Sequence, residues 1–286
     1  MNDLLFLDAG QSSELKEQGY AVFDLLDNDT LEELTDMFHS YHAETPQGFY
    51  ATTHLADKNI AKEISDRLSS LLKEKIEGKF ENIDLLGGAF ISKSPGEKGI
   101  LPLHQDWNLV DESEARSYNL WIPLVDANEE NGAMRILPAS HIKQTTFRGP
   151  NVAPVLYPIS SEVDQHMFSL NMKKGQAVMY DHALWHSSPK NQTNDLRLAL
   201  VMGALPLNSE MRYYHQNGEL VEEYASYPNF FFENNRDDGP KGLELIRSFE
   251  HPNAFLSKEE FETIYLGKEV KQETKKGLFQ RLFGGK

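Results

Sequence analysis

The sequence contains no cysteine, and this absence removes several kinds of chemistry at once. Without a thiol there is no disulfide scaffold, no cysteine nucleophile, no iron–sulfur cluster and no zinc site with sulfur ligands. Basic residues are also scarce, because 28 lysines and arginines stand against 44 acidic residues and the formal net charge is −16. A chain of this charge repels nucleic-acid phosphates and anionic lipid, so we expect neither as a partner.

Long apolar runs are missing as well. No run reaches the length of about 18 residues that a membrane-spanning helix needs, so no membrane span is expected. The first residues, MNDLLFLDAGQSS, include two acids and no basic residue, which is atypical of a secretion signal. We therefore expect a cytoplasmic protein with a small-molecule substrate, and the sequence carries no signal of its oligomeric state.

Familiar nucleotide and hydrolase signatures are also absent. The chain has no Walker A loop, no G-x-G-x-x-G, no G-x-S-x-G and no H-E-x-x-H pattern. The commonest motifs for nucleotide binding, hydride transfer, serine hydrolysis and zinc proteolysis are thereby excluded. The ten histidines are the next group to consider.

The N-terminal part, residues 1–82, predicts a helical scaffold. The strongest helix is expected over residues 58–78, where apolar residues recur at helical spacing on one face. A second helix is expected near Asp29 and Thr30, which form a capping-box pattern with Glu33. The apolar stripe of the first helix consists of Ile60, Ile64, Leu68, Leu71, Leu72 and Ile76.

From residue 83 onward the pattern changes to short apolar runs between glycine, proline and asparagine. Runs such as YNLWIPLV, QAVMYD and LRLALVMGAL are typical of strands, and Asn131-Gly132 and Lys174-Gly175 of the turns between them. Many short strands with polar turns indicate a mainly β fold with flanking helices: a sandwich, a barrel or a jelly roll.

We expect one catalytic domain over residues 1–270. Its β core is expected over residues 83–206, followed by an irregular, aromatic-rich extension over residues 207–270. A short helix in this extension is predicted to start at Ser257. Residues 271–286 are expected to form a flexible tail.

Candidate metal ligands lie in LPLHQDW, where His104 and Asp106 are two residues apart. If this run is a strand, both side chains point to the same face. A third ligand should come from another strand, and His186 follows the run QAVMYD by a few residues. His182, four residues earlier, is the competing candidate. Two histidines and one carboxylate on one face are the ligand set of non-haem Fe(II) oxygenases.

Arg197 lies inside the otherwise apolar run LRLALVM, eleven residues after His186. A buried arginine needs an anion nearby. The anion is either the carboxylate of a structural ion pair or that of a bound ligand, gripped by the guanidinium fork. A histidine followed by such an arginine fits an enzyme that holds a dicarboxylate beside iron.

With these residues in place, the sequence resembles the phytanoyl-CoA dioxygenase family of Fe(II)/2-oxoglutarate oxygenases. The similar stretches are PLHQDW, LWIPLVDANEENGAMRILPASH, GQAVMYDHALWHSSPKN and RLALVM, within residues 83–206, with a looser likeness in the N-terminal helices. The resemblance implies a double-stranded β-helix, a cupin-like jelly roll. It implies Fe(II), with 2-oxoglutarate and O₂ as cosubstrates. It also implies that His104, Asp106 and His186 hold the iron and that Arg197 pairs with the C5 carboxylate of 2-oxoglutarate.

The resemblance assigns further residues. Ser188 matches a position that hydrogen-bonds the same carboxylate, and Trp121 an aromatic that lines the cosubstrate pocket. Asn119, two residues earlier on the same face, is expected to line it too. His141 and Arg135 are interpreted as structural, with substrate contact as the alternative for Arg135.

The implied activity is hydroxylation of an unactivated C–H bond of a small metabolite, with succinate and CO₂ as co-products. Asp106 favours hydroxylation over halogenation, because a small residue replaces this carboxylate in halogenating relatives. Desaturation and ring closure remain alternatives. So does a cupin-like metal-dependent isomerase or hydrolase, which would use the same three ligands but not Arg197. A non-catalytic binding module is the third interpretation, and it would predict a scrambled ligand set.

Substrate contacts are expected from loops and flanking segments. The candidates are the segment 48–54, Trp107 with Asn108, and the segments 143–166 and 213–232. His54 and Arg148 are candidates for meeting an anionic group. No basic cluster suited to a coenzyme A nucleotide is present, which favours a small polar metabolite over an acyl-CoA.

Overall fold

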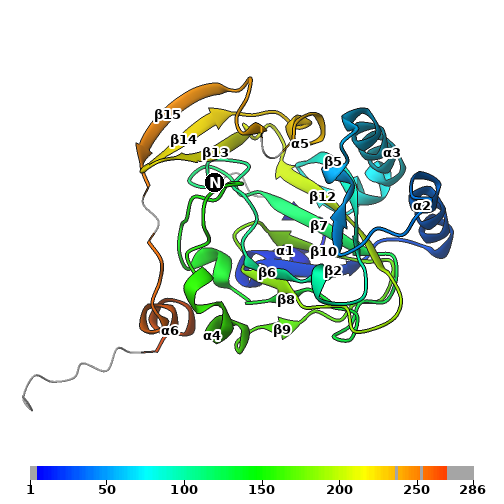
Figure 1. The fold of residues 1–286 in the computed structure, drawn as a ribbon, viewed down its shortest axis with the longest axis horizontal. Coiled ribbons are helices and arrows are strands. Elements are labelled where there is room, and N and C mark those ends of the chain that lie inside the picture. The colour runs from blue at the N-terminus through cyan, green and yellow to red at the C-terminus, as the bar shows by residue number, and fades with distance from the viewer. Residues whose placement is uncertain (1–4, 236–237, 252–253, 269–286) are drawn as a thin grey trace, which may run out of the picture.

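The centre of the chain is a jelly roll of two antiparallel sheets, seen in a computed structural model that describes residues 5–235, 238–251 and 254–268 (Figure 1). The expected mainly β fold is therefore confirmed. The larger sheet has the order β2-β10-β7-β12-β5-β3, and the smaller has the order β6-β11-β8-β9. The strands are β2 (Tyr20–Asp24), β3 (Phe49–Ala51), β5 (Ile83–Lys93), β6 (Leu101–His104), β7 (Tyr118–Pro123), β8 (Arg135–Ile136), β9 (Phe168–Ser169), β10 (Gln176–Asp181), β11 (His186–Ser188) and β12 (Arg197–Pro206).

The larger sheet begins earlier in the chain than the sequence indicates. Strand β2 pairs with β10, and β3 pairs with β5, so the segment 1–82 contributes two edge strands as well as helices. The run YAVFD in β2 alternates between more and less buried residues, as a strand with one covered face does. It is only five residues long, and the helical spacing around it is the stronger signal.

Three helices accompany the larger sheet: α1 (Ala9–Gln18), α2 (Asn28–Tyr41) and α3 (Lys58–Glu77). The helix predicted over residues 58–78 is confirmed as α3. The helix predicted near Asp29 is confirmed as α2, but its cap is wrong. Asp27 is the N-cap, and its carboxylate accepts from the backbone N–H and the hydroxyl of Thr30. The helix therefore starts before the predicted Asp29–Glu33 capping box.

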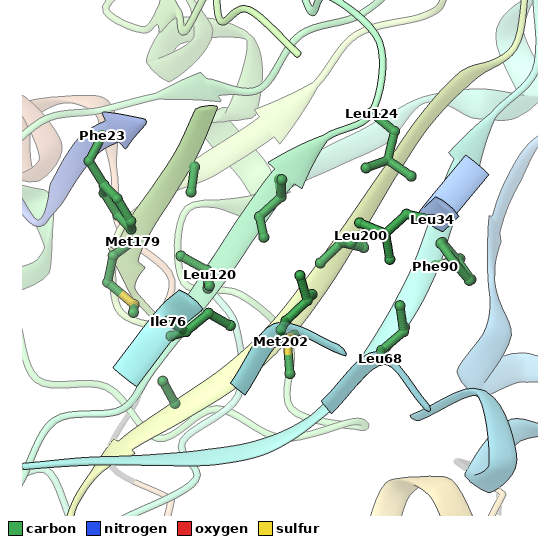
Figure 2. Close-up of a cluster of buried hydrophobic side chains, with 14 of the residues drawn as sticks. Phe23, Leu34, Leu68, Ile76, Phe90, Leu120, Leu124, Met179, Leu200 and Met202 are labelled. Carbon is green, nitrogen blue, oxygen red and sulfur yellow. The ribbon is translucent and has the colours of Figure 1, made fainter. Parts of the chain in front are cut away.

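The main core fills the space between α2, α3 and the outer face of the larger sheet (Figure 2). Phe90, Leu120, Leu200 and Met202 of the sheet belong to one buried cluster with Leu34, Leu68 and Ile76 of the helices. The alternate residues of the same strands point into the jelly roll, where Trp121, Val178, Tyr180 and Ala199 form a second cluster. This alternation also directs Lys93, Asn119 and Arg197 inward.

The C-terminal segment is more regular than expected. It forms a three-stranded sheet, β13-β14-β15, at the top of Figure 1. The predicted helix at Ser257 is confirmed as α6, with a capping box between Ser257 and Glu260. The predicted tail, residues 271–286, lies outside the described residues. This segment contains β13 (Arg212–Asn217), β14 (Leu220–Ala225), α5 (Phe230–Glu233), β15 (Glu244–Glu250) and α6 (Lys258–Leu266).

The remaining elements are short. No helix within the described ranges is both long and apolar enough to cross a membrane. The short elements are β1 (Leu5–Phe6), η1 (Thr52–His54), β4 (Phe80–Glu81), η2 (Glu97–Gly99), η3 (Ser140–Ile142), η4 (Tyr157–Ile159) and α4 (Ser160–Asp164).

Candidate metal centre and anion pocket

Strands β6 and β11 bring His104, Asp106 and His186 together. The two histidines are direct partners in the antiparallel ladder, with ring centroids 4.2 Å apart. Asp106 follows the end of β6 by two residues. Its Oδ1 lies 3.7 Å from Nε2 of His104, and its Oδ2 lies 3.8 Å from Nε2 of His186. One ligand atom from each residue lies within 4.8 Å of the others, a spacing that allows all three to bind one metal ion.

Both histidines are oriented by backbone carbonyls. Nδ1 of His104 lies 2.7 Å from the carbonyl oxygen of Pro102, and Nδ1 of His186 lies 2.9 Å from that of Leu184. A carbonyl only accepts, so each Nδ1 carries the hydrogen and each Nε2 keeps its lone pair. The two lone pairs are thus presented on the side where Asp106 lies, as a metal site requires.

The charge states also suit a metal ion. Burial and the neighbouring His186 lower the pKa of His104 to about 4. Burial alone would raise the pKa of Asp106, but His186, His182 and His104 and a hydrogen bond from Asn119 hold it below its usual range. Near neutral pH, His104 is therefore neutral and Asp106 ionised, the forms that bind metal.

Asn119 and Tyr180 surround the carboxylate of Asp106. Nδ2 of Asn119 donates to Oδ2 of Asp106 at 2.8 Å and lies 3.4 Å from the hydroxyl of Tyr180. Tyr180 also hydrogen-bonds Asp106, and its ring meets that of His186 edge-on at 5.1 Å. Asn119, expected to line the cosubstrate pocket, thus contacts a candidate metal ligand. The sequence analysis did not predict a role for Tyr180, although its strand leads directly to the HALWH run that contains His186.

The competing histidine, His182, lies outside the group of three. It is buried, and within the described chain neither of its ring nitrogens has a hydrogen-bond partner. Of the two alternatives that the sequence left open, the structure brings His186 to the candidate metal centre.

A buried basic site, called the anion pocket below, meets strand β11 at Ser188, two residues after His186. Arg197 is 3% exposed, and its Nη1 donates to the carbonyl of Gly132 at 2.6 Å and to Oγ of Ser188 at 3.3 Å. Its guanidinium carbon lies 5.4 Å from the ring centre of Trp121, while its Nε has no partner in the described chain. Among the described residues no carboxylate pairs with Arg197, so the structural ion pair considered from the sequence is not formed there.

Lys93 is a second basic residue at this site, and sequence reasoning missed it. It is 0% exposed and lies directly opposite Arg197 in the pairing of β5 with β12. Its Nζ donates to the carbonyl and the hydroxyl of Ser188 and to the carbonyl of Pro189. Burial, and then the charge of Arg197, lower the pKa of Lys93 to about 6. The available sequence signal was its position directly after the apolar run GGAFIS, which places a lysine at the end of a buried strand.

The residues interpreted as structural have structural partners. Arg135 pairs with Asp164, and Nε2 of His141 lies 3.1 Å from the carbonyl of Lys16. Arg148 was considered either a surface residue or a contact for an anionic substrate, and the structure contradicts the surface alternative. It is buried and paired with Glu112, while its Nε donates to the backbone carbonyl of Asp106. It therefore braces the loop that carries Asp106. His54, the other candidate for an anionic contact, lies in the short helix η1.

Some of the expected substrate segments do meet. The ring of Trp107, next to Asp106, lies 5.2 Å from that of Phe231, which stacks on Tyr213 at 5.9 Å. Phe147, in the segment 143–166, contacts Tyr214 at 5.2 Å. The C-terminal sheet and α5 thus place aromatic rings against the residue that follows a candidate ligand.

Comparison with known proteins gives a family and a fold. The model of the phytanoyl-CoA dioxygenase (PhyH) family matches residues 15–199. A relative in Aspergillus terreus, named dioxygenase trt7, is 27% identical over 169 residues, which cover 54% of this chain and 54% of that protein. The chain thus spans about half the length of this curated relative.

Two solved structures share the fold. The epimerase SnoN, in complex with Fe3+, alpha ketoglutarate and nogalamycin RO, is 17% identical with a TM-score of 0.54, covering 87% of this chain and 94% of that one. HygX from Streptomyces hygroscopicus, with nickel, 2-oxoglutarate and hygromycin B bound, is 16% identical with a TM-score of 0.52. That match covers 70% of this chain and 88% of HygX.

Proposed function

Because this chain belongs to the phytanoyl-CoA dioxygenase family, we propose that it is an Fe(II)- and 2-oxoglutarate-dependent oxygenase acting on a small organic molecule. One juxtaposition supports this function above all. A His, Asp, His group lies beside a buried arginine that no carboxylate pairs with among the described residues. Strand β11 links the two, since it carries both His186 and Ser188, which accepts from Arg197.

The three ligands fit iron by their donor set and by their spacing. His104, Asp106 and His186 offer two imidazole nitrogens and one carboxylate oxygen, which is the set that non-haem Fe(II) oxygenases use, with positions left for other ligands. When bound, iron supplies the O₂ chemistry that side chains lack. These three residues would hold the ion through the two Nε2 atoms and the carboxylate, and Asn119 fixes that carboxylate by a hydrogen bond.

The anion pocket fits the remote carboxylate of 2-oxoglutarate. Arg197 supplies the charge, Ser188 the hydroxyl, and Trp121 a flat wall under the guanidinium. A cupin-like isomerase or hydrolase would have no use for such an arginine. Arg197 is buried and has no carboxylate partner among the described residues, which favours the oxygenase over that alternative.

We assign C–H hydroxylation as the outcome, because Asp106 occupies the third ligand position and leaves none there for a halide. SnoN, which shares the fold, is an epimerase, so the product itself has to be measured. Hydroxylation adds one oxygen atom, desaturation or ring closure removes two hydrogens, and epimerisation leaves the mass unchanged. Mass spectrometry of the turned-over substrate distinguishes these outcomes.

The function is tested by succinate formation. Fe(II)-loaded protein, given 2-oxoglutarate and O₂, should form succinate, and Asp106→Ala should form none. Lys173→Met, a change at an exposed lysine paired with Asp126, is the matched surface control and should behave as wild type. Absence of succinate from wild-type protein that retains bound iron would reject the oxygenase assignment.

A further inference from the structure

The sheet ladder places two of the three candidate metal ligands but not the third. Strand β6 ends at His104, which pairs with His186 of β11. Asp106 lies beyond that ladder, in residues 105–108, called the Asp106 loop below. Asn119 bonds the carboxylate, but the backbone of the loop needs support of its own to keep that carboxylate opposite His186.

Arg148 provides part of this support. Its Nε donates to the backbone carbonyl of Asp106 at 2.7 Å, and its backbone N–H donates to Oδ1 of Asn108 at 2.6 Å. The other end of its guanidinium forms two hydrogen bonds with the carboxylate of Glu112. Because a buried charge is costly without its partner, Glu112 in turn holds Arg148 in place.

A second arginine extends this contact toward the strand that carries the other ligand. Nη1 of Arg116 lies 3.4 Å from Oε2 of Glu112. Nε and Nη2 of Arg116 donate to the two oxygens of Asp181, at 2.8 and 2.6 Å. The carbonyl of Asp181 accepts from the N–H of Leu184, whose own carbonyl orients His186. The turn that leads into β11 is therefore anchored to Arg116.

The same turn also contacts the Asp106 loop directly. Oδ1 of Asp181 accepts from the N–H of Ala183 at 2.7 Å, and the carbonyl of Ala183 accepts from Nε2 of Gln105 at 2.6 Å. Gln105 stands between His104 and Asp106 in the chain. A displacement of the turn would therefore be passed on to the segment that carries two candidate ligands.

The two arginines and two carboxylates form one chain of alternating charges, in the order Arg148, Glu112, Arg116 and Asp181. The charges sum to zero, and each inner member has an opposite charge on both sides. Burial alone would lower the pKa of Arg116, but Asp181 and Glu112 hold it above its ordinary value. The chain thus joins the Asp106 loop to the turn before β11 through groups that are costly to separate inside a protein.

We propose that this chain of four charges positions the metal centre, and that Arg116 is the positioning residue that holds the Asp106 loop against the turn before β11. The inference rests on the proposed function, because it concerns the same candidate ligands. The side chain of Arg116 bonds Glu112, Asp181 and the carbonyl of His141, so it would act on a metal ion through the ligand segments. Without this link the ligands would be less well placed to bind one ion together.

The first test replaces Arg116 with lysine, which keeps the charge but loses the fork that spans two carboxylates. Arg212→Lys is the matched control, because Arg212 also pairs with two carboxylates, those of Glu210 and Glu223. The two arginine side chains are 16% and 14% exposed. Competition with a chelator under argon measures the Kd of Fe(II). Arg116→Lys should weaken Fe(II) binding by about 10- to 100-fold, and Arg212→Lys by less than about twofold.

A second variant breaks the same chain at its end. Asp181→Asn removes one charge with little change of shape, and it should weaken Fe(II) binding in the same range as Arg116→Lys. Urea unfolding of the metal-free proteins establishes that each variant is folded in the titration. Wild-type affinity in Arg116→Lys or Asp181→Asn, or an equal loss in Arg212→Lys, would overturn the proposal, because the chain would then contribute only general stability.

A third measurement reports the geometry of the site. The visible bands of bound Co(II) depend on the number and arrangement of its ligands. Co(II)-saturated Arg116→Lys should differ from wild type in the position or intensity of these bands, while Arg212→Lys should match it. An Arg116→Lys spectrum identical with that of wild type would overturn the positioning role. Failure of wild type to bind Fe(II) would instead reject the proposed function.

Discussion

At the residue scale, the candidate metal centre depends on hydrogen bonds that settle which atom each ligand offers. Backbone carbonyls hold Nδ1 of His104 and of His186, and Asn119 holds one oxygen of Asp106. Such partners orient a ligand before metal arrives and so reduce the cost of organising the site. The three side chains are therefore placed for metal binding by the fold itself.

Replacing each of the two nearby histidines separately distinguishes their roles. His186→Ala should lower the affinity for Fe(II) by at least about 100-fold, because one of three protein ligands is lost. His182→Ala changes a histidine that is equally buried but lies outside the ligand group, and it should keep one Fe(II) per chain. Metal content after equilibrium dialysis measures both. Loss of iron from His182→Ala with retention by His186→Ala would reverse the assignment.

The buried lysine makes a pH prediction for the protein free of metal and anion. Its pKa is lowered to about 6 in the fold, against an ordinary value of 10.5. Between these values the unfolded chain binds the extra proton, so Lys93 contributes a free energy of unfolding that rises with pH. The difference in unfolding free energy between wild type and Lys93→Met should therefore grow from about pH 6 to about pH 10. Urea unfolding at several pH values measures this difference. Parallel pH profiles of the unfolding free energy for wild type and Lys93→Met would contradict the lowered pKa of Lys93.

The sequence was most informative where a motif has fixed spacing. H-x-D, the later histidine and the arginine after it were found in that way. The structure groups the first three residues and places the arginine in contact with Ser188, on the strand of the later histidine. Lys93 and Tyr180 were missed because no motif includes them. Their positions depend on which face of a strand they occupy and on which residue stands opposite, and that register is set by pairing between distant strands.

At the element scale, the turn between β7 and β8 supports the anion pocket. Its residue Gly132 has a φ of 75°, and its carbonyl accepts from both Arg197 and Ser188. A Cβ there would lie 2.5 Å from the carbonyl oxygen of Pro189. The position thus requires glycine both for its backbone conformation and for the close approach of the neighbouring chain.

Gly132→Ala should therefore cost more than an alanine at another left-handed glycine. Gly218, in the β13–β14 hairpin, has a φ of 62° and open space within 4 Å of the point where a Cβ would lie, so Gly218→Ala is the matched control. We expect about 1 kcal/mol of destabilisation for Gly218→Ala and at least about 2 kcal/mol more for Gly132→Ala. Denaturant unfolding measures both values. Equal losses would show that the turn can relax away from Pro189.

Helices α2 and α3 were predictable because their apolar stripes repeat over three or more turns. The edge strands β2 and β3 were not, since five and three residues carry too little alternation to compete with the helical spacing around them. The three-stranded C-terminal sheet was also missed. Its outer strand β15 is exposed over almost its whole length, so it lacks the buried alternation that marks a strand.

At the scale of the whole molecule, the jelly roll joins segments that are far apart in the chain. Lys93, His104, Gly132, His186 and Arg197 come from β5, β6, a turn, β11 and β12, and the pairing of the strands sets their neighbours. The net charge of −16 opposes the approach of a dianion. Arg197, buried without a carboxylate partner in the described chain, is a local exception to that charge.

The most direct test of this account is an anaerobic titration of the Fe(II)-loaded protein with 2-oxoglutarate, followed by visible absorbance. Wild type should develop a weak charge-transfer band that saturates at one 2-oxoglutarate per iron. Arg197→Ala should need a much higher concentration, and His186→Ala should show no band. No band in wild type with iron still bound would contradict the account, because the jelly roll would then hold a metal but not this cosubstrate.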